Sequence, residues 1–146
     1  MRLNTASETI SFLKDLESRS AGFYEALARN HQAEGELFLV FAKENKKNIT
    51  TIERTYFGVI TDAIEGCFAF QIDPEAYVIR TEALPGSYAD SLAKALEMED
   101  TIVRFYLDAA GQSKCLMADV PRVMERIAKV RGERRKRLQD MLDKAG

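Results

Sequence analysis

The sequence has little of the chemistry that most metal sites and hydrolytic sites require. It contains one histidine, His31, two cysteines, Cys67 and Cys115, and no tryptophan. The cysteines lie far apart and belong to no C-x-x-C pair, so we expect neither a disulfide framework nor a paired-thiolate metal site. There is also no Gly-rich phosphate loop and no G-x-S-x-G motif, and one histidine is too few for most acid–base designs. These absences disfavour a hydrolase.

Proline, glycine and long apolar runs are scarce as well. The 146 residues include only three prolines and eight glycines, whereas 46% of them are apolar and 30% are charged. This composition is typical of a helical soluble protein, and the length fits one domain, residues 1–146, with one core. No apolar run approaches the roughly 20 residues of a membrane span, and the first residues lack the apolar centre of a signal peptide. We therefore expect a cytoplasmic protein with no membrane partner.

Apolar residues recur at helical spacing in four segments. The predicted helices span residues 6–30, 34–64, 87–111 and 119–144. Thr5 and Glu8 have capping-box spacing at the start of the first helix, as do Ser87 and Asp90 at the start of the third. Asp119, which precedes a Val-Pro pair, marks the start of the fourth. The fold class predicted from this pattern is an all-α four-helix bundle.

The segment 65–86 is predicted to be a connection because it has no helical stripe and carries two of the three prolines. Its length is sufficient to cross the whole bundle, so the second and third helices are expected to be roughly parallel. Two helical hairpins joined by one long crossover is a topology of ferritin-like folds. The segment also contains Phe68, Phe70 and Tyr77, which either form a binding surface or plug the bundle.

The two halves of the chain are similar to each other. Aligning Phe23-Tyr24 with Phe105-Tyr106 also aligns Glu17 with Glu99. The chain therefore resembles a helical hairpin used twice.

Several polar residues fall on the apolar stripes, where bundles build their cofactor sites. Glu17, Asn45, Glu99 and Arg134 are predicted to point inward, with Asn48 at the edge of its stripe. Other interpretations stay open. The two glutamates can be solvated at the rim of their stripes, and Asn45 can be a polar core residue that sets the helix register.

The basic run from Lys129 to Arg137 is typical of a solvated helix face, with long side chains lying over the core. We assign Arg131, Arg135 and Lys136 to that face. Arg134 is the exception, because an apolar residue would be expected at its position.

These helices resemble those of the rubrerythrin branch of the ferritin-like superfamily over nearly the whole chain. LESRSAGFYEALA is similar to the first helix of that family, and ALEMEDTIVRFYLDAA to the third, with an inward glutamate six residues before a Phe-Tyr pair. FAKENKKNITTIERTY resembles the second helix and VRGERRKRLQDML the fourth, each of which carries a Glu-x-x-His pair in the family.

The resemblance implies a degenerate di-iron site. Family members hold two iron ions with one glutamate from each of two helices and a Glu-x-x-His pair from each of the others. Only Glu17 and Glu99 keep a ligand-type side chain here, as a vestigial metal site. The remaining former ligand positions fall on Asn45, Asn48, Arg134 and Arg137, with a shift of one residue left open in the fourth helix. Asparagine offers only a neutral amide oxygen and arginine no acceptor.

We therefore predict a ferritin-like, homodimeric binding or scaffold module that has lost its di-iron centre and needs no cofactor. The guanidinium of Arg134, with that of Arg137, is expected to replace iron as the counter-charge to the two carboxylates. The alternative is an oxidoreductase or iron-handling protein that binds iron or another divalent metal. Its remodelled site would comprise Glu17, Glu99, Glu44 and Glu133.

Nucleic-acid binding through the fourth helix is disfavoured, because the net charge is −2 and acidic residues interrupt the basic run. A small-molecule ligand is compatible with the binding role, but no motif identifies it.

Overall fold

The computed structural model describes residues 3–59, 70–81, 86–113 and 119–145. These residues form four α-helices and two short 3-10 helices, and their only β-type pairing is an isolated bridge between Leu3 and Ile72. The α-helices are α1 (Ala6–Asn30), α2 (Gly35–Val59), α4 (Tyr88–Ser113) and α5 (Val120–Ala145). The all-helical prediction is confirmed, while the last part of the predicted second helix, 60–64, lies outside the described residues. None of the four helices is both long and apolar enough to span a bilayer.

The helix starts follow the capping residues of the sequence. The Thr5 hydroxyl accepts a hydrogen bond from the Glu8 amide, and the Glu8 carboxylate accepts one from the Thr5 amide, both at 3.1 Å. Ser87 accepts a hydrogen bond from the amide of Asp90 at 3.0 Å. The Asp119 carbonyl accepts the first backbone hydrogen bond of α5. The Thr5 and Ser87 side chains each satisfy an amide that the first helical turn leaves without a partner.

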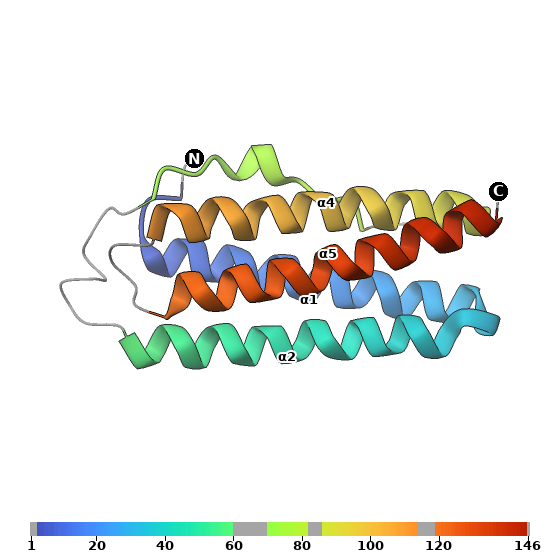
Figure 1. Ribbon diagram of the computed structural model, residues 1–146, viewed down its shortest axis with the longest axis horizontal. Helices are drawn as coiled ribbons and strands as arrows, with labels where there is room; N and C mark the ends of the chain where they lie inside the picture. The colour runs from blue at the N-terminus through green and yellow to red at the C-terminus, as the bar shows by residue number, and fades with distance from the viewer. Residues whose placement is uncertain (1–2, 60–69, 82–85, 114–118, 146) are drawn as a thin grey trace.

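The helices pack as two antiparallel pairs, α1 with α2 and α4 with α5, and the pairs lie against each other (Figure 1). Figure 1 also shows that α2 and α4 run in the same direction. One hydrophobic core runs through the bundle. Its largest fully buried apolar and aromatic side chains include Leu13, Phe23, Tyr24, Phe38, Phe105 and Tyr106.

The described part of the connection, residues 70–81, lies on the outside of α1 and α4 (Figure 1). Phe70 and Tyr77 are only 1% and 8% exposed, and the Tyr77 hydroxyl donates to Asp108 of α4. Arg19 of α1 donates to the carbonyl oxygen of Ile79 at 2.8 Å. The two aromatic residues therefore pack against the bundle, and the idea that they form an exposed binding surface is wrong. Phe68 lies outside the described residues.

Candidate functional site

Six polar side chains are buried halfway along the bundle. Five are fully shielded from solvent and Arg134 is 5% exposed. They are Glu17 and Ser20 of α1, Asn45 of α2, Glu99 of α4, and Arg131 and Arg134 of α5. Burying charged groups costs several kcal/mol per ion unless each finds a partner, so the contacts within this cluster decide whether it stabilises the bundle.

Arg131 joins the two carboxylates. Its Nε and Nη2 donate to Oε1 and Oε2 of Glu17 at 3.1 and 2.8 Å, a bidentate pairing. Its Nη1 donates to Oε1 of Glu99 at 2.5 Å, and Nη2 also reaches the amide oxygen of Asn45 at 3.0 Å. One guanidinium thus bridges α1, α2 and α4 from α5, and its planar fork makes this possible where an ammonium would not.

Two tyrosine hydroxyls each donate a hydrogen bond to the glutamate of the opposite helix. The hydroxyl of Tyr24 on α1 donates to Oε2 of Glu99 on α4 at 2.6 Å. The hydroxyl of Tyr106 on α4 donates to Oε1 of Glu17 on α1 at 2.7 Å. Each tyrosine lies seven residues after the glutamate of its own helix and bonds the glutamate of the other. The similarity of the two halves of the sequence therefore has a counterpart in the hydrogen bonds of the core.

Arg134 lies beside this bridge but is less completely bonded. Its Nη1 donates to Asn45 at 2.8 Å and to Oε2 of Glu99 at 3.4 Å. Its Nη2 donates to Glu44 at 3.3 Å, and the guanidinium carbon lies 4.6 Å from the centre of the Phe41 ring, within cation–π range. Its Nε is buried and has no hydrogen-bond partner. The expected contact between Arg134 and Glu99 is present, but the principal counter-charge is Arg131.

The electrostatics of the cluster favour the charged form of Glu99 and the neutral forms of the two tyrosines. Burial raises the pKa of Glu99, but attraction to Arg131 and Arg134 outweighs it and leaves this pKa below its usual value. Burial and the adjacent carboxylates raise the pKa of Tyr24 and of Tyr106 well above the ordinary value. Burial lowers the pKa of Arg131, but the two glutamates more than compensate and raise it.

These shifts predict that stability falls at both ends of the pH range. The pKa of Glu99 is lower in the folded state, so its contribution is complete above its unfolded pKa of about 4.3 and is lost as the pH falls below it. The pKa values of Tyr24 and Tyr106 are raised, so their contribution is complete below about pH 10 and is lost above it. Urea unfolding measured from pH 3 to pH 11 should show both declines.

A matched pair of variants tests whether Glu99 causes the loss of stability at low pH. Glu99→Gln is expected to flatten it, whereas Glu97→Gln changes an exposed neighbour on the same helix and should leave it intact. If the free energy of unfolding of Glu99→Gln falls at low pH as steeply as that of the unmodified protein, the cluster does not hold this carboxyl in its charged form.

The prediction that Arg131 belongs to the wet face of its helix is wrong. Arg131 is fully buried, whereas the apolar residue before it, Val130, is 45% exposed. The buried face of the helix therefore includes Arg131 as well as the predicted Arg134, and its inward i, i+3 pair is Arg131 with Arg134. The spacing of Arg131 from Ile127 and Leu138, four and seven residues, was the signal that could have revealed it.

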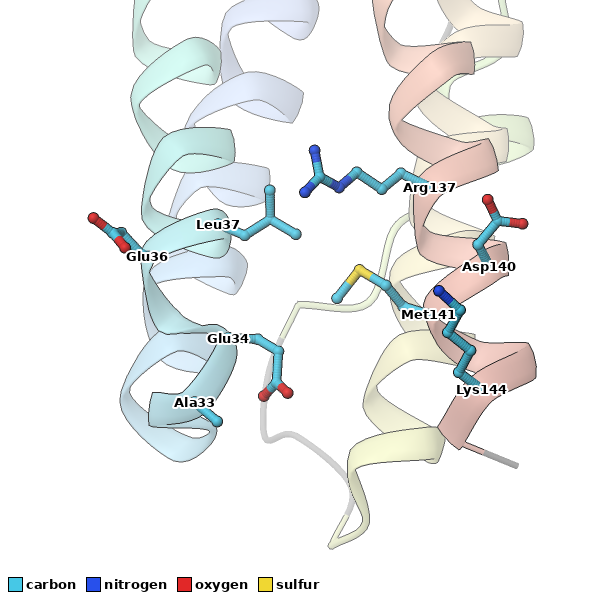
Figure 2. A pocket seen from close by; sticks show the side chains of 8 residues that line it. All are labelled: Ala33, Glu34, Glu36, Leu37, Arg137, Asp140, Met141 and Lys144. Atoms are coloured by element: carbon cyan, nitrogen blue, oxygen red, sulfur yellow. The ribbon is translucent and has the colours of Figure 1, made fainter.

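Arg137 lies outside the cluster. It is exposed and lines a cleft of about 530 Å³ near one end of the bundle. Figure 2 shows its side chain extending from α5 toward α2, near Leu37 and Met141. The predicted pairing of Arg137 with the two carboxylates is therefore wrong, and the buried arginines of α5 are Arg131 and Arg134.

The remaining candidate residues divide between the edge of the cluster and the surface. Asn48 is half-buried and its amide donates to both oxygens of Glu17 at 3.3 and 3.4 Å. Glu44 contacts Arg134 but its side chain is 41% exposed, and Glu133 is exposed. A carboxylate site that combines Glu133 with the two buried glutamates is therefore not formed.

The donor set does not fit a di-iron centre. All four carboxylate oxygens of Glu17 and Glu99 accept hydrogen bonds from arginine, tyrosine or asparagine side chains. The guanidinium between them is positively charged and has no lone pair for a metal. Within the part of the chain that the structure describes, no group of three or more His, Cys, Asp and Glu side chains is placed to hold a metal ion.

Comparisons of the chain with known protein families, with curated proteins and with solved structures find no match.

Proposed function

We propose that this chain is a rubrerythrin-related, ferritin-like protein in which two arginines have taken the place of the metal ions, and that it acts as a binding or scaffold module. The observation that carries the proposal is the bridge from Arg131 to both Glu17 and Glu99. It places a fixed positive charge between two carboxylates that face each other from α1 and α4.

The positions of the polar residues support the family assignment. Carboxylate di-iron bundles use one residue from each of two helices and an i, i+3 pair from each of the other two. Here the single residues are the glutamates of α1 and α4, and the pairs are Asn45 with Asn48 on α2 and Arg131 with Arg134 on α5. This arrangement supports the proposed relationship, in which all four residues of the two pairs have been replaced.

The helix directions support the same assignment. Because α2 and α4 run in the same direction, the chain between them has to pass from one end of the bundle to the other. Residues 70–81, which lie along the outside of α1 and α4, are consistent with the long crossover of ferritin-like folds.

The chemistry of the cluster supports a binding role over a redox role. Unlike an iron ion, neither an arginine nor an asparagine side chain transfers electrons or binds dioxygen. All four oxygens of the two carboxylates already accept hydrogen bonds, so the cluster is suited to holding the bundle together. Function then depends on the surface of the bundle.

The iron content of the purified protein tests this proposal. Protein produced in iron-supplemented medium is expected to contain far less than one iron per chain by elemental analysis, because four of the six ligand positions lack a carboxylate or imidazole. About two iron ions per chain, with oxo-bridge absorption bands in the oxidised protein, would support the oxidoreductase alternative instead.

A further inference from the structure

A groove between α2 and α5 opens next to the buried cluster. It encloses about 310 Å³ and adjoins a second hollow of about 470 Å³, with which it shares Arg126. The groove is lined by Glu44, Lys47, Asn48 and Thr51 of α2 and by Arg126, Ile127, Val130 and Arg134 of α5. Three of these residues are cationic and one is anionic.

Arg134 connects the buried cluster to this groove. Its side chain is 2% exposed, yet it borders the groove together with its partner Glu44. The contact between them is a single one of 3.3 Å, and the Glu44 side chain is 41% exposed. Because Glu44 reaches Arg134 through this one contact and its carboxylate is partly open to solvent, another carboxylate can compete with it for Nη2 of Arg134. The unpartnered Nε shows that the hydrogen-bonding capacity of Arg134 is not exhausted.

The rim of the groove is cationic and one of its walls is apolar, which favours a ligand that is both anionic and partly apolar. Lys47 and Arg126 are exposed, and within the described ranges neither of them forms an ion pair. Ile127 is buried and Val130 is 45% exposed, so one wall of the groove is apolar. The cleft at the end of the bundle (Figure 2) differs, because acidic residues outnumber basic ones in its lining and it contains no buried polar side chain.

We propose that the groove between α2 and α5 binds a small organic carboxylate. The carboxylate displaces Glu44 from Arg134 and is flanked by Lys47 and Arg126, while a short aliphatic part lies on Ile127 and Val130. Without ligand, the carboxylate of Glu44 occupies the position next to Arg134 that the carboxylate of the ligand takes. This inference deepens the proposed binding role by naming the ligand class.

Titration of the isotopically labelled protein with sodium butyrate at constant ionic strength, followed by NMR, tests the proposal. Saturable shifts are expected for residues that line the groove, including the side-chain Nε–H of Arg134. Acetate should bind more weakly and hexanoate more tightly, by up to about fourfold for each methylene that becomes buried. Inorganic phosphate serves as the comparison anion that lacks an aliphatic part.

Adjacent residues provide matched controls. Lys47→Gln should weaken butyrate binding by up to about fivefold, whereas Lys46→Gln should not, because Lys46 pairs with Glu25 outside the groove. Glu44→Gln removes the internal competitor and should tighten binding. Glu53→Gln makes the same charge change on α2 at a residue that pairs with Lys14, and it should have no effect.

Absence of saturable shifts would overturn the proposal, as would equal effects of the groove and control substitutions. Phosphate binding as tight as that of butyrate, with no dependence on chain length, would replace it with a general anion site. None of these outcomes depends on the iron content of the protein, so failure here is distinguishable from failure of the proposed function.

Discussion

Replacing Arg131 with methionine is expected to lower the free energy of unfolding by about 3 to 5 kcal/mol at neutral pH. The substitution leaves Glu17 without its bidentate partner and Glu99 without its shortest hydrogen bond, although both remain fully buried. Urea unfolding of the two proteins measures the difference.

Arg135→Met is the matched control, because Arg135 lies on the same helix and pairs with Asp100 at the surface, where its side chain is 41% exposed. This control should cost about 1 kcal/mol or less. Similar losses in the two variants would mean that the buried position of Arg131 gives it no special role in stability.

The second large effect is a gain of metal binding. A variant with Asn45→Glu, Asn48→His, Arg131→Glu and Arg134→His supplies the two Glu-x-x-His pairs that the ferritin-like pattern requires, while Glu17 and Glu99 stay in place. The purified variant is expected to bind about two ferrous ions per chain, as measured by titration and elemental analysis, because all six side chains would then be metal donors.

The position of the second pair can be tested separately. A variant that places Glu at 134 and His at 137, with the same changes on α2, directs its histidine to the exposed surface. It should not bind iron stoichiometrically. If it binds as well as the first variant, the assignment of Arg131 and Arg134 to the former ligand positions is wrong.

Local signals in the sequence were sufficient to locate the helices. The caps at Thr5, Ser87 and Asp119 act within one turn, so their spacing in the sequence determines where each helix begins. The inward polar residues Glu17 and Glu99 were also found, because each interrupts a stripe of otherwise apolar residues.

The orientation of α5 could not be obtained in the same way. Arginine at a given position is compatible with a solvated face or with a buried ion pair, and the choice depends on carboxylates from α1 and α4 that are distant in sequence. A rotation of about 100° per residue separates Val130 from Arg131, and several residues around this helix are basic. Hydrophobicity alone therefore favours the valine as the buried residue, while ion pairing across helices places the arginine inside.

The groove beside Arg134 could not be predicted from the sequence for a similar reason. Its cationic residues come from two helices, Lys47 on α2 and Arg126 on α5, and no spacing within either helix relates them. Only the packing of α2 against α5 brings them to one surface.

The most direct measurement of the central claim, that a guanidinium serves as the counter-charge of the two buried carboxylates, is the coupling free energy between Arg131 and the pair Glu17 and Glu99. It is obtained from urea unfolding of Arg131→Met, of Glu17→Gln with Glu99→Gln, and of the triple variant at neutral pH. We expect the triple variant to be more stable than the sum of the separate losses predicts by at least about 2 kcal/mol, because removing all the charges leaves none unpaired. Losses that add to within about 0.5 kcal/mol would contradict the claim.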